Sequence, residues 1–128
     1  MSDNGQNLYE LEKDEFDKLI KNKSDFLLTG TKLFFEQGKD TDFVLTEDKW
    51  KEILGYKADF DYQKWVCYKY ITEKGKSFDF IVVRNEKFSD WELATKTACI
   101  LIKESQKFRE WFKKKLHRQR YFSAYIYS

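Results

Sequence analysis

A chain of 128 residues is long enough for one hydrophobic core and too short for two, so we expect a single domain over residues 1–128. Hydrophobic residues make up 41% of the chain and charged residues 36%, a balance that excludes a disordered tail. The net charge of +2 gives no strong overall field that would indicate nucleic acid, and no apolar run approaches the roughly 20 residues that span a membrane.

The N-terminal end is acidic and polar, where a signal peptide would be basic and then apolar. We therefore expect a cytoplasmic protein with no membrane partner. Residues 1–7 are expected to be disordered, and apolar residues at helical spacing from Leu8 to Ile20 predict a first helix. Cys67 and Cys99 lie in apolar runs, which favours free thiols.

The next segments alternate between strand and helix patterns. Residues 25–29 (DFLLT) predict a strand that ends at Gly30, and residues 31–37 (TKLFFEQ) predict one or two helical turns. Residues 41–45 (TDFVL) predict a second strand.

A helix is predicted over residues 47–54, with Thr46 as a hydroxyl N-cap and Gly55 as its end. Residues 57–63 (KADFDYQ) are expected to form a loop. The Asp-x-Asp within it, Asp59 and Asp61, is followed by no apolar run, which favours a solvated surface.

Two further strands, residues 65–72 and 77–83, flank a turn that requires Gly75, the pattern of a β-hairpin. Ser89 and Glu92 then predict a capping box at the start of a long C-terminal helical segment. Together these patterns predict an α/β (α+β) fold, with a small mixed sheet covered by helices on one side.

Two predicted strands carry an aspartate in an apolar setting, Asp42 in TDFVL and Asp79 in FDFIVV. Burying an ionised carboxylate costs several kcal/mol unless a partner compensates it. Asp40 shares a face with Asp42, because side chains alternate along a strand. Three carboxylates at this density predict a site for Mg²⁺ or Mn²⁺.

Gly30 stands between a strand and a helical turn, where its backbone can approach a phosphate. Thr31 adds a hydroxyl and Lys32 a positive charge. The sequence thus contains a glycine followed by a hydroxyl residue, then a spacer, an Asp-x-Asp and an acid in a later strand. This pattern resembles that of the DNA polymerase β-like nucleotidyltransferase superfamily. The resemblance implies a minimal nucleotidyltransferase fold. It also implies that Asp40, Asp42 and Asp79 bind the metal ions that carry a nucleoside triphosphate.

The second half resembles the small nucleotidyltransferase-like proteins of bacteriophages, through Phe88, Trp91, Ala94 and Thr95 and the basic segment 113–127. This likeness implies the host cell cytoplasm as the location. By the same likeness, Gly30, Thr31 and Lys32 would bind the nucleotide, and the protein would transfer a nucleoside monophosphate to an unidentified hydroxyl of a nucleic acid, protein or small molecule.

Two differences from the family pattern keep an alternative open. Thr31 stands where serine is usual, and the spacer before Asp40 is shorter than usual. The alternative is an inactive nucleotidyltransferase-fold module, a phage-encoded factor that binds nucleotide, nucleic acid or a host protein. A further polyanion-binding surface is predicted in the C-terminal segment, where the basic residues are Lys113, Lys114, Lys115, Arg118 and Arg120.

Overall fold

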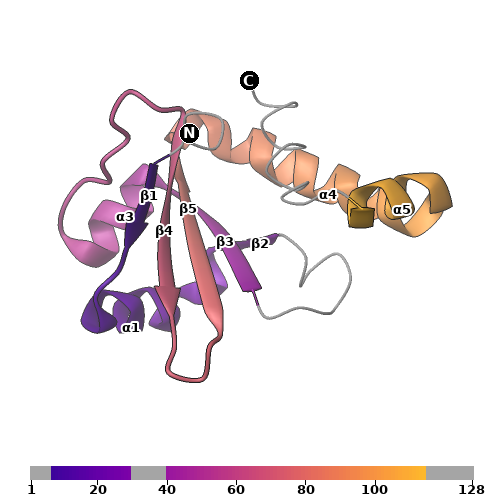
Figure 1. Ribbon diagram of the computed structural model, residues 1–128. Helices are drawn as coiled ribbons and strands as arrows, with labels where there is room; N and C mark the ends of the chain where they lie inside the picture. The colour runs from indigo at the N-terminus through magenta and orange to yellow at the C-terminus, as the bar shows by residue number, and fades with distance from the viewer. Residues whose placement is uncertain (1–6, 30–39, 115–128) are drawn as a thin grey trace. The chain divides into compact units, whose positions relative to one another are not determined.

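A computed structural model describes residues 7–29 and 40–114 of the chain (Figure 1). The chain divides into two compact units, Met1–Phe88 and Ser89–Ser128. The sheet belongs to the first unit, and the second unit is helical over its described residues.

The first unit is built on a five-stranded sheet formed by β1 Asn7–Glu10, β2 Leu27–Thr29, β3 Asp40–Thr46, β4 Trp65–Ile71 and β5 Ser77–Val83. The strand order is β1-β4-β5-β3-β2. β1 pairs with β4 and β3 with β5 in parallel, whereas β2 and β3, and β4 and β5, are antiparallel. The predicted α/β fold with a small mixed sheet is therefore confirmed.

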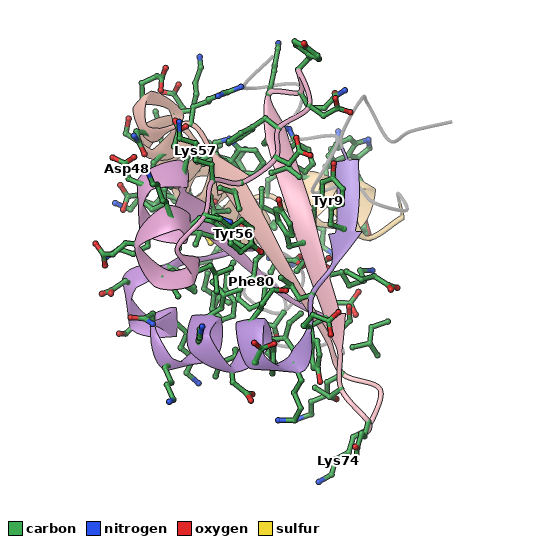
Figure 2. The ribbon with its side chains drawn as sticks, turned by 90° about the vertical axis from the view of Figure 1, so that its left-hand side faces the viewer. Tyr9, Asp48, Tyr56, Lys57, Lys74 and Phe80 are labelled. Carbon is green, nitrogen blue, oxygen red and sulfur yellow. The ribbon has the colours of Figure 1, made fainter. Side chains whose placement is uncertain are left out.

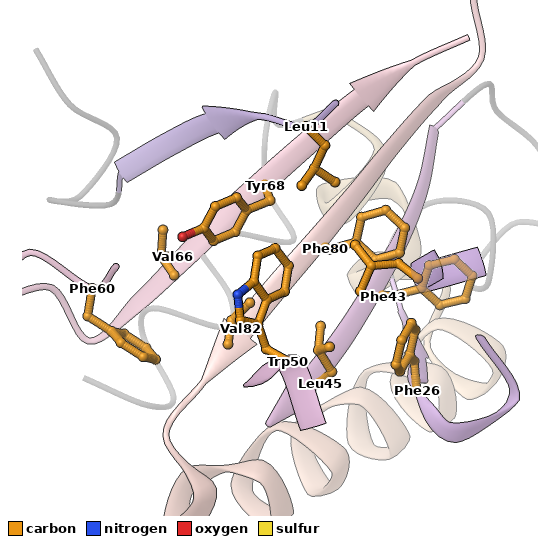
Figure 3. Close-up of a cluster of buried hydrophobic side chains, with 11 residues drawn as sticks. Leu11, Phe26, Phe43, Leu45, Trp50, Phe60, Val66, Tyr68, Phe80 and Val82 are labelled. Atoms are coloured by element: carbon orange, nitrogen blue, oxygen red, sulfur yellow. The ribbon is translucent and has the colours of Figure 1, made fainter. Parts of the chain in front are cut away.

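Two helices, α1 (Lys13–Lys21) and α3 (Glu47–Leu54), pack on one face of this sheet, which we call the core face. Phe43 and Phe80 stack there with ring centroids 5.6 Å apart, and the Trp50 ring of α3 lies 4.1 Å from that of Tyr68 (Figure 3). Trp50 and Phe80 have no exposed surface. Strand alternation turns the intervening residues to the opposite face, which we call the far face.

The predicted boundary residues of α3 and of the hairpin are confirmed. The Thr46 hydroxyl accepts a hydrogen bond from the Lys49 backbone at 3.1 Å, which satisfies one free N–H of the first turn. Gly55 ends the helix with φ +84°, and Gly75 has φ +85° in the β4–β5 turn. Lys74 stands at the tip of this hairpin (Figure 2). Both glycines adopt a left-handed conformation that other residues rarely accept.

The prediction for the N-terminal segment is partly wrong. Asn7, expected to be disordered, begins β1, and the first helix starts at Lys13 instead of near Leu8. The backbone N–H of Leu11 donates to Lys69, and the Tyr9 ring stacks on Tyr68 with centroids 5.2 Å apart. Pairing with a strand about sixty residues away thus overrides the helical spacing, since tertiary contacts outweigh local propensity.

The second unit contains the predicted long helical segment as two helices, α4 (Phe88–Glu104) and α5 (Gln106–Lys114). α4 begins one residue before Ser89, because a 3₁₀ turn over Asn85–Lys87 leads directly into it, so the predicted capping box does not mark its start. The Ser105 hydroxyl accepts from the Phe108 backbone at 3.2 Å, which fixes the break between the helices.

Two remaining expectations concern the cysteines and membrane spans. Cys67 and Cys99 are free thiols, as predicted. Within residues 7–29 and 40–114, no helix combines the length and apolar character needed to cross a bilayer.

Candidate functional site

Two of the predicted site residues meet on the far face of the sheet. Asp42 of β3 lies directly opposite Asp79 of β5 in the parallel pair. Neighbouring strands are about 4.8 Å apart, and directly opposed residues point to the same face. Residues that are 37 positions apart in the sequence therefore form one carboxylate pair, which we call the aspartate pair.

The aspartate pair lies in an unfavourable setting for negative charge. Asp79 is only 7% exposed and Asp42 is half-buried. If the two charges were separated by about the strand spacing of 5 Å, they would repel each other by about 3 kcal/mol at an effective dielectric constant of about 20. Such a pair is stable when a nearby cation or ligand balances its charge.

Asp40 and Ser77 extend the same end of the far face. Asp40 lies two residues before Asp42, pairs with Ser77 across the strands and is exposed. Ser77 is 9% exposed, and its hydroxyl has no hydrogen-bond partner within the part of the chain that the structure describes. Because buried hydroxyls are normally hydrogen-bonded, this one indicates a position where a ligand atom would be favoured.

A row of polar residues crosses all five strands at the level of the aspartate pair, and we call it the polar row. The strand registers place Glu10 beside Lys69, Lys69 beside Asp79, and Asp42 beside Thr29. Lys69 Nζ lies 3.9 Å from Asp79 Oδ1, at the outer limit of an ion pair. The row thus contains one lysine beside the two buried or half-buried carboxylates.

The other end of the far face is apolar. Val44, Ile81 and Val83 follow the aspartates along β3 and β5, and Cys67 precedes Lys69 on β4. These four side chains are at most 4% exposed. Among the described strands, charged side chains on the far face are therefore confined to the end where β3 and β5 begin, as expected for a local binding site and not for a solvated sheet face.

Other predicted site residues fall beyond the described part of the chain. Gly30, Thr31 and Lys32, with the helical turns predicted over 31–37, are among these, although Thr29 immediately before them pairs with Asp42. Of the predicted basic surface, Lys113 and Lys114 belong to the last turn of α5. The remaining basic residues, Lys115, Arg118 and Arg120, lie outside the described residues.

The donor atoms of the aspartate pair fit a hard divalent cation. Carboxylate and hydroxyl oxygens are the ligands that Mg²⁺ and Mn²⁺ prefer, and Asp42, Asp79 and Ser77 supply them on one face. In the described ranges, no group of three or more His, Cys, Asp or Glu side chains is close enough to hold a metal ion. The arrangement therefore consists of two carboxylates with a hydroxyl beside them, and Asp40 further out.

Sequence reasoning missed Lys69 and Ser77. The hairpin pattern contained the necessary information, because a turn centred on Lys74 pairs Ile71 with Ser77 and therefore Lys69 with Asp79. The lysine in WVCYKYI is the polar exception in its strand, as Asp79 is in FDFIVV. A register drawn through the turn would have placed them together.

A second Asp-x-Asp lies in the loop after α3, and its aspartates are exposed as predicted. Asp59 accepts hydrogen bonds from the Tyr9 hydroxyl at 3.3 Å and from the Asp61 backbone at 3.1 Å, and its own N–H donates to the Tyr68 hydroxyl at 3.0 Å. Burial, followed by the charge of Asp59, raises the pKa of Tyr9. Burial also raises the pKa of Tyr68, although its hydrogen bond with the Asp59 backbone acts in the opposite direction.

The chain matches no known protein-family model, no curated protein and no solved structure.

Proposed function

We propose that the protein is a metal-dependent nucleotidyltransferase that transfers a nucleoside monophosphate from a nucleoside triphosphate to an acceptor hydroxyl. One observation carries the proposal: Asp42 and Asp79 lie directly opposite each other on one face, although β3 and β5 are far apart in the sequence. The superfamily pattern in the sequence requires these two acids to share a site.

The chemistry requires little covalent participation by the protein. The acceptor oxygen forms a bond to the α-phosphorus, the bond from that phosphorus to the bridging oxygen breaks, pyrophosphate leaves, and the hydroxyl proton passes to solvent or a base. A bound Mg²⁺ or Mn²⁺ would neutralise charge on the phosphates and lower the pKa of the attacking hydroxyl. Asp42 and Asp79 would hold this cation, with the Ser77 hydroxyl beside them, and Asp40 would add negative charge at the exposed end of the site.

The position of the glycine motif also supports the proposal. Thr29, which precedes Gly30, pairs with Asp42 at the edge of the sheet. Gly30, Thr31 and Lys32, which we propose bind the nucleotide, therefore directly follow in the sequence a residue that is paired with Asp42. Catalysis of phosphoryl-type transfer depends mainly on positioning the reacting groups.

Isothermal titration of the full chain with each ribonucleoside triphosphate tests the proposal. The titrations are made with Mg²⁺ and again with EDTA, on the wild type and on Asp42→Asn. Asp59→Asn is the matched control, since it changes an aspartate of the second Asp-x-Asp, which lies in an exposed loop. We expect binding that requires both the metal and Asp42 and that is unchanged in Asp59→Asn.

Other results would contradict the proposal in different ways. Nucleotide binding that persists in EDTA and in Asp42→Asn would favour the inactive binding module. Binding to RNA or DNA that falls steeply with salt and survives loss of the aspartates would favour a nucleic-acid-binding protein that acts through its basic C-terminal segment.

A further inference from the structure

Lys69 is an unusual residue for its position. It lies in β4 among Trp65, Val66, Cys67 and Tyr68, all of which are at most 8% exposed. Its ammonium group stands beside the buried Asp79, with 30% of the lysine side chain and 10% of the aspartate side chain exposed. A lysine placed in a strand of this kind normally has a charged partner.

The geometry of the Lys69–Asp79 pair is loose. The separation of 3.9 Å from Nζ to Oδ1 exceeds the 2.7–2.9 Å or so of a charge-assisted hydrogen bond. Lysine is a point charge on a flexible stem, and the exposed part of this side chain gives the ammonium group a path to solvent. The lysine can therefore balance the aspartate pair and still move away.

We propose that Lys69 is the internal counter-ion of the aspartate pair and that a divalent cation replaces it, so that the Lys69–Asp79 ion pair and the metal compete for the same carboxylate. This inference rests on the proposed metal site. An ammonium group and a divalent cation repel each other when both lie against one carboxylate, so each weakens the binding of the other. Lys69 acts as a positioning residue in this role and takes no part in the transfer step.

The buried Ser77 hydroxyl supports a ligand position beside this pair. Ser77 lies two residues before Asp79 on the same face, and its hydroxyl has no hydrogen-bond partner in residues 7–29 and 40–114. Lys69 pairs opposite Asp79 and not opposite Ser77, so the ion pair leaves this hydroxyl unsatisfied. A cation bound at the aspartate pair would give the hydroxyl a partner.

Mn²⁺ binding without nucleotide tests the competition. Binding is measured by the electron paramagnetic resonance signal of free Mn²⁺ for the wild type, Lys69→Met, which keeps the stem length, and Lys69→Arg, which keeps the charge. Lys74→Met at the hairpin tip is the matched control. We expect Lys69→Met to bind Mn²⁺ about tenfold more tightly, as a coupling of this kind usually gives. Lys69→Arg and Lys74→Met should bind like the wild type.

A second measurement uses the native protein and does not depend on how the variants fold. Acetylation of Lys69 in the wild type is followed by mass spectrometry with and without Mn²⁺, with Lys74 as the internal reference. If the metal displaces the ammonium group, acetylation of Lys69 should be several-fold faster with Mn²⁺ while that of Lys74 is unchanged.

The outcomes separate this inference from the proposed function. In one outcome, the wild type binds Mn²⁺ through Asp42 while Lys69→Met binds it no more tightly and Lys69 acetylation does not change. In that case the proposed competition between Lys69 and the metal is wrong, and the proposed metal site stands. If neither the wild type nor Lys69→Met binds Mn²⁺, the metal site itself is wrong and Lys69 is only a structural counter-ion.

Discussion

The two Asp-x-Asp motifs have the same spacing but opposite settings. Asp40 and Asp42 lie in β3, where Asp42 faces Asp79 across a parallel strand pair. Asp59 and Asp61 lie in an exposed loop, where Asp59 accepts hydrogen bonds from Tyr9 and from the Asp61 backbone. The strand motif brings two like charges together, whereas in the loop motif the Asp59 carboxylate accepts hydrogen bonds. The scaffold, and not the motif, therefore distinguishes a candidate site from a surface turn.

The largest expected effect is on catalysis. Asp79→Asn removes one charge of the aspartate pair, and loss of several kcal/mol of metal binding in the transition state corresponds to a decrease of at least about a thousandfold in kcat/KM. Asp61→Asn should leave the rate within about twofold of the wild type, since a change in an exposed loop alters the barrier by a few tenths of a kcal/mol at most. Release of pyrophosphate is the measurement. Equal losses in both variants would mean that the two motifs do not differ as proposed.

Stability in the absence of metal should change in opposite directions for the two motifs. Asp42→Asn relieves repulsion from Asp79, so we expect the free energy of unfolding to rise by about 1 kcal/mol. Asp59→Ala removes the acceptor for Tyr9 and for the Asp61 backbone, and we expect a decrease of about 1 kcal/mol. Urea unfolding in EDTA measures both. A decrease in Asp42→Asn would show that the aspartate pair is not electrostatically strained.

The region around the loop motif should lose stability at high pH. Burial raises the pKa of Tyr56, and a hydrogen bond to Glu15 adds to this effect. The pKa of Tyr9 and of Tyr68 is raised as well. The unfolded chain releases these protons near pH 10, while the folded protein retains them. Stabilisation is therefore complete below about pH 10 and is lost as the pH rises towards the folded pKa values.

Unfolding by urea at pH 9 and at pH 11 measures this loss. We expect Tyr56→Phe to reduce the difference between the two pH values, because it removes one of the groups that titrate. Tyr62→Phe is the control, since the Tyr62 side chain is fully exposed to solvent. A pH dependence that is the same in Tyr56→Phe as in the wild type would exclude this tyrosine as a source.

The smallest effect concerns the backbone of the loop. Asp61 and Tyr62 have φ values of +47° and +66°, a region that is unfavourable for a bulky residue and tolerated by asparagine. We expect Tyr62→Asn to stabilise the protein by about 0.5 kcal/mol. Thermal unfolding detects this change. A destabilised Tyr62→Asn would mean that the tyrosine ring contributes contacts in spite of its exposure.

The sequence predicted the features that depend on neighbouring residues. Thr46, Gly55 and Gly75 act where expected, because caps and tight turns are determined within a few residues. The run FDFIVV alone predicts that Asp79 lies in a strand, and it does. These local patterns were enough for the mixed α/β fold.

Long-range pairing explains what the sequence did not predict. β1 has four residues and gains its stability from β4, about sixty residues later, so its own pattern resembled the start of a helix. The parallel register of β3 against β5 is also a property of the assembled sheet, although the sequence pattern predicts that Asp42 and Asp79 share one site. The same holds for the ion pair between Lys69 and Asp79, which requires the register of β4 against β5.

The parallel pairing of β3 with β5 also has a consequence for the order of folding. The β4–β5 hairpin closes through a short turn and can form early, whereas β3 joins β5 only after a much longer loop has closed. We therefore expect Lys69 and Asp79 to come together before Asp42 joins them. The repulsion within the aspartate pair would then arise late in folding, when the hairpin has already placed a positive charge beside it.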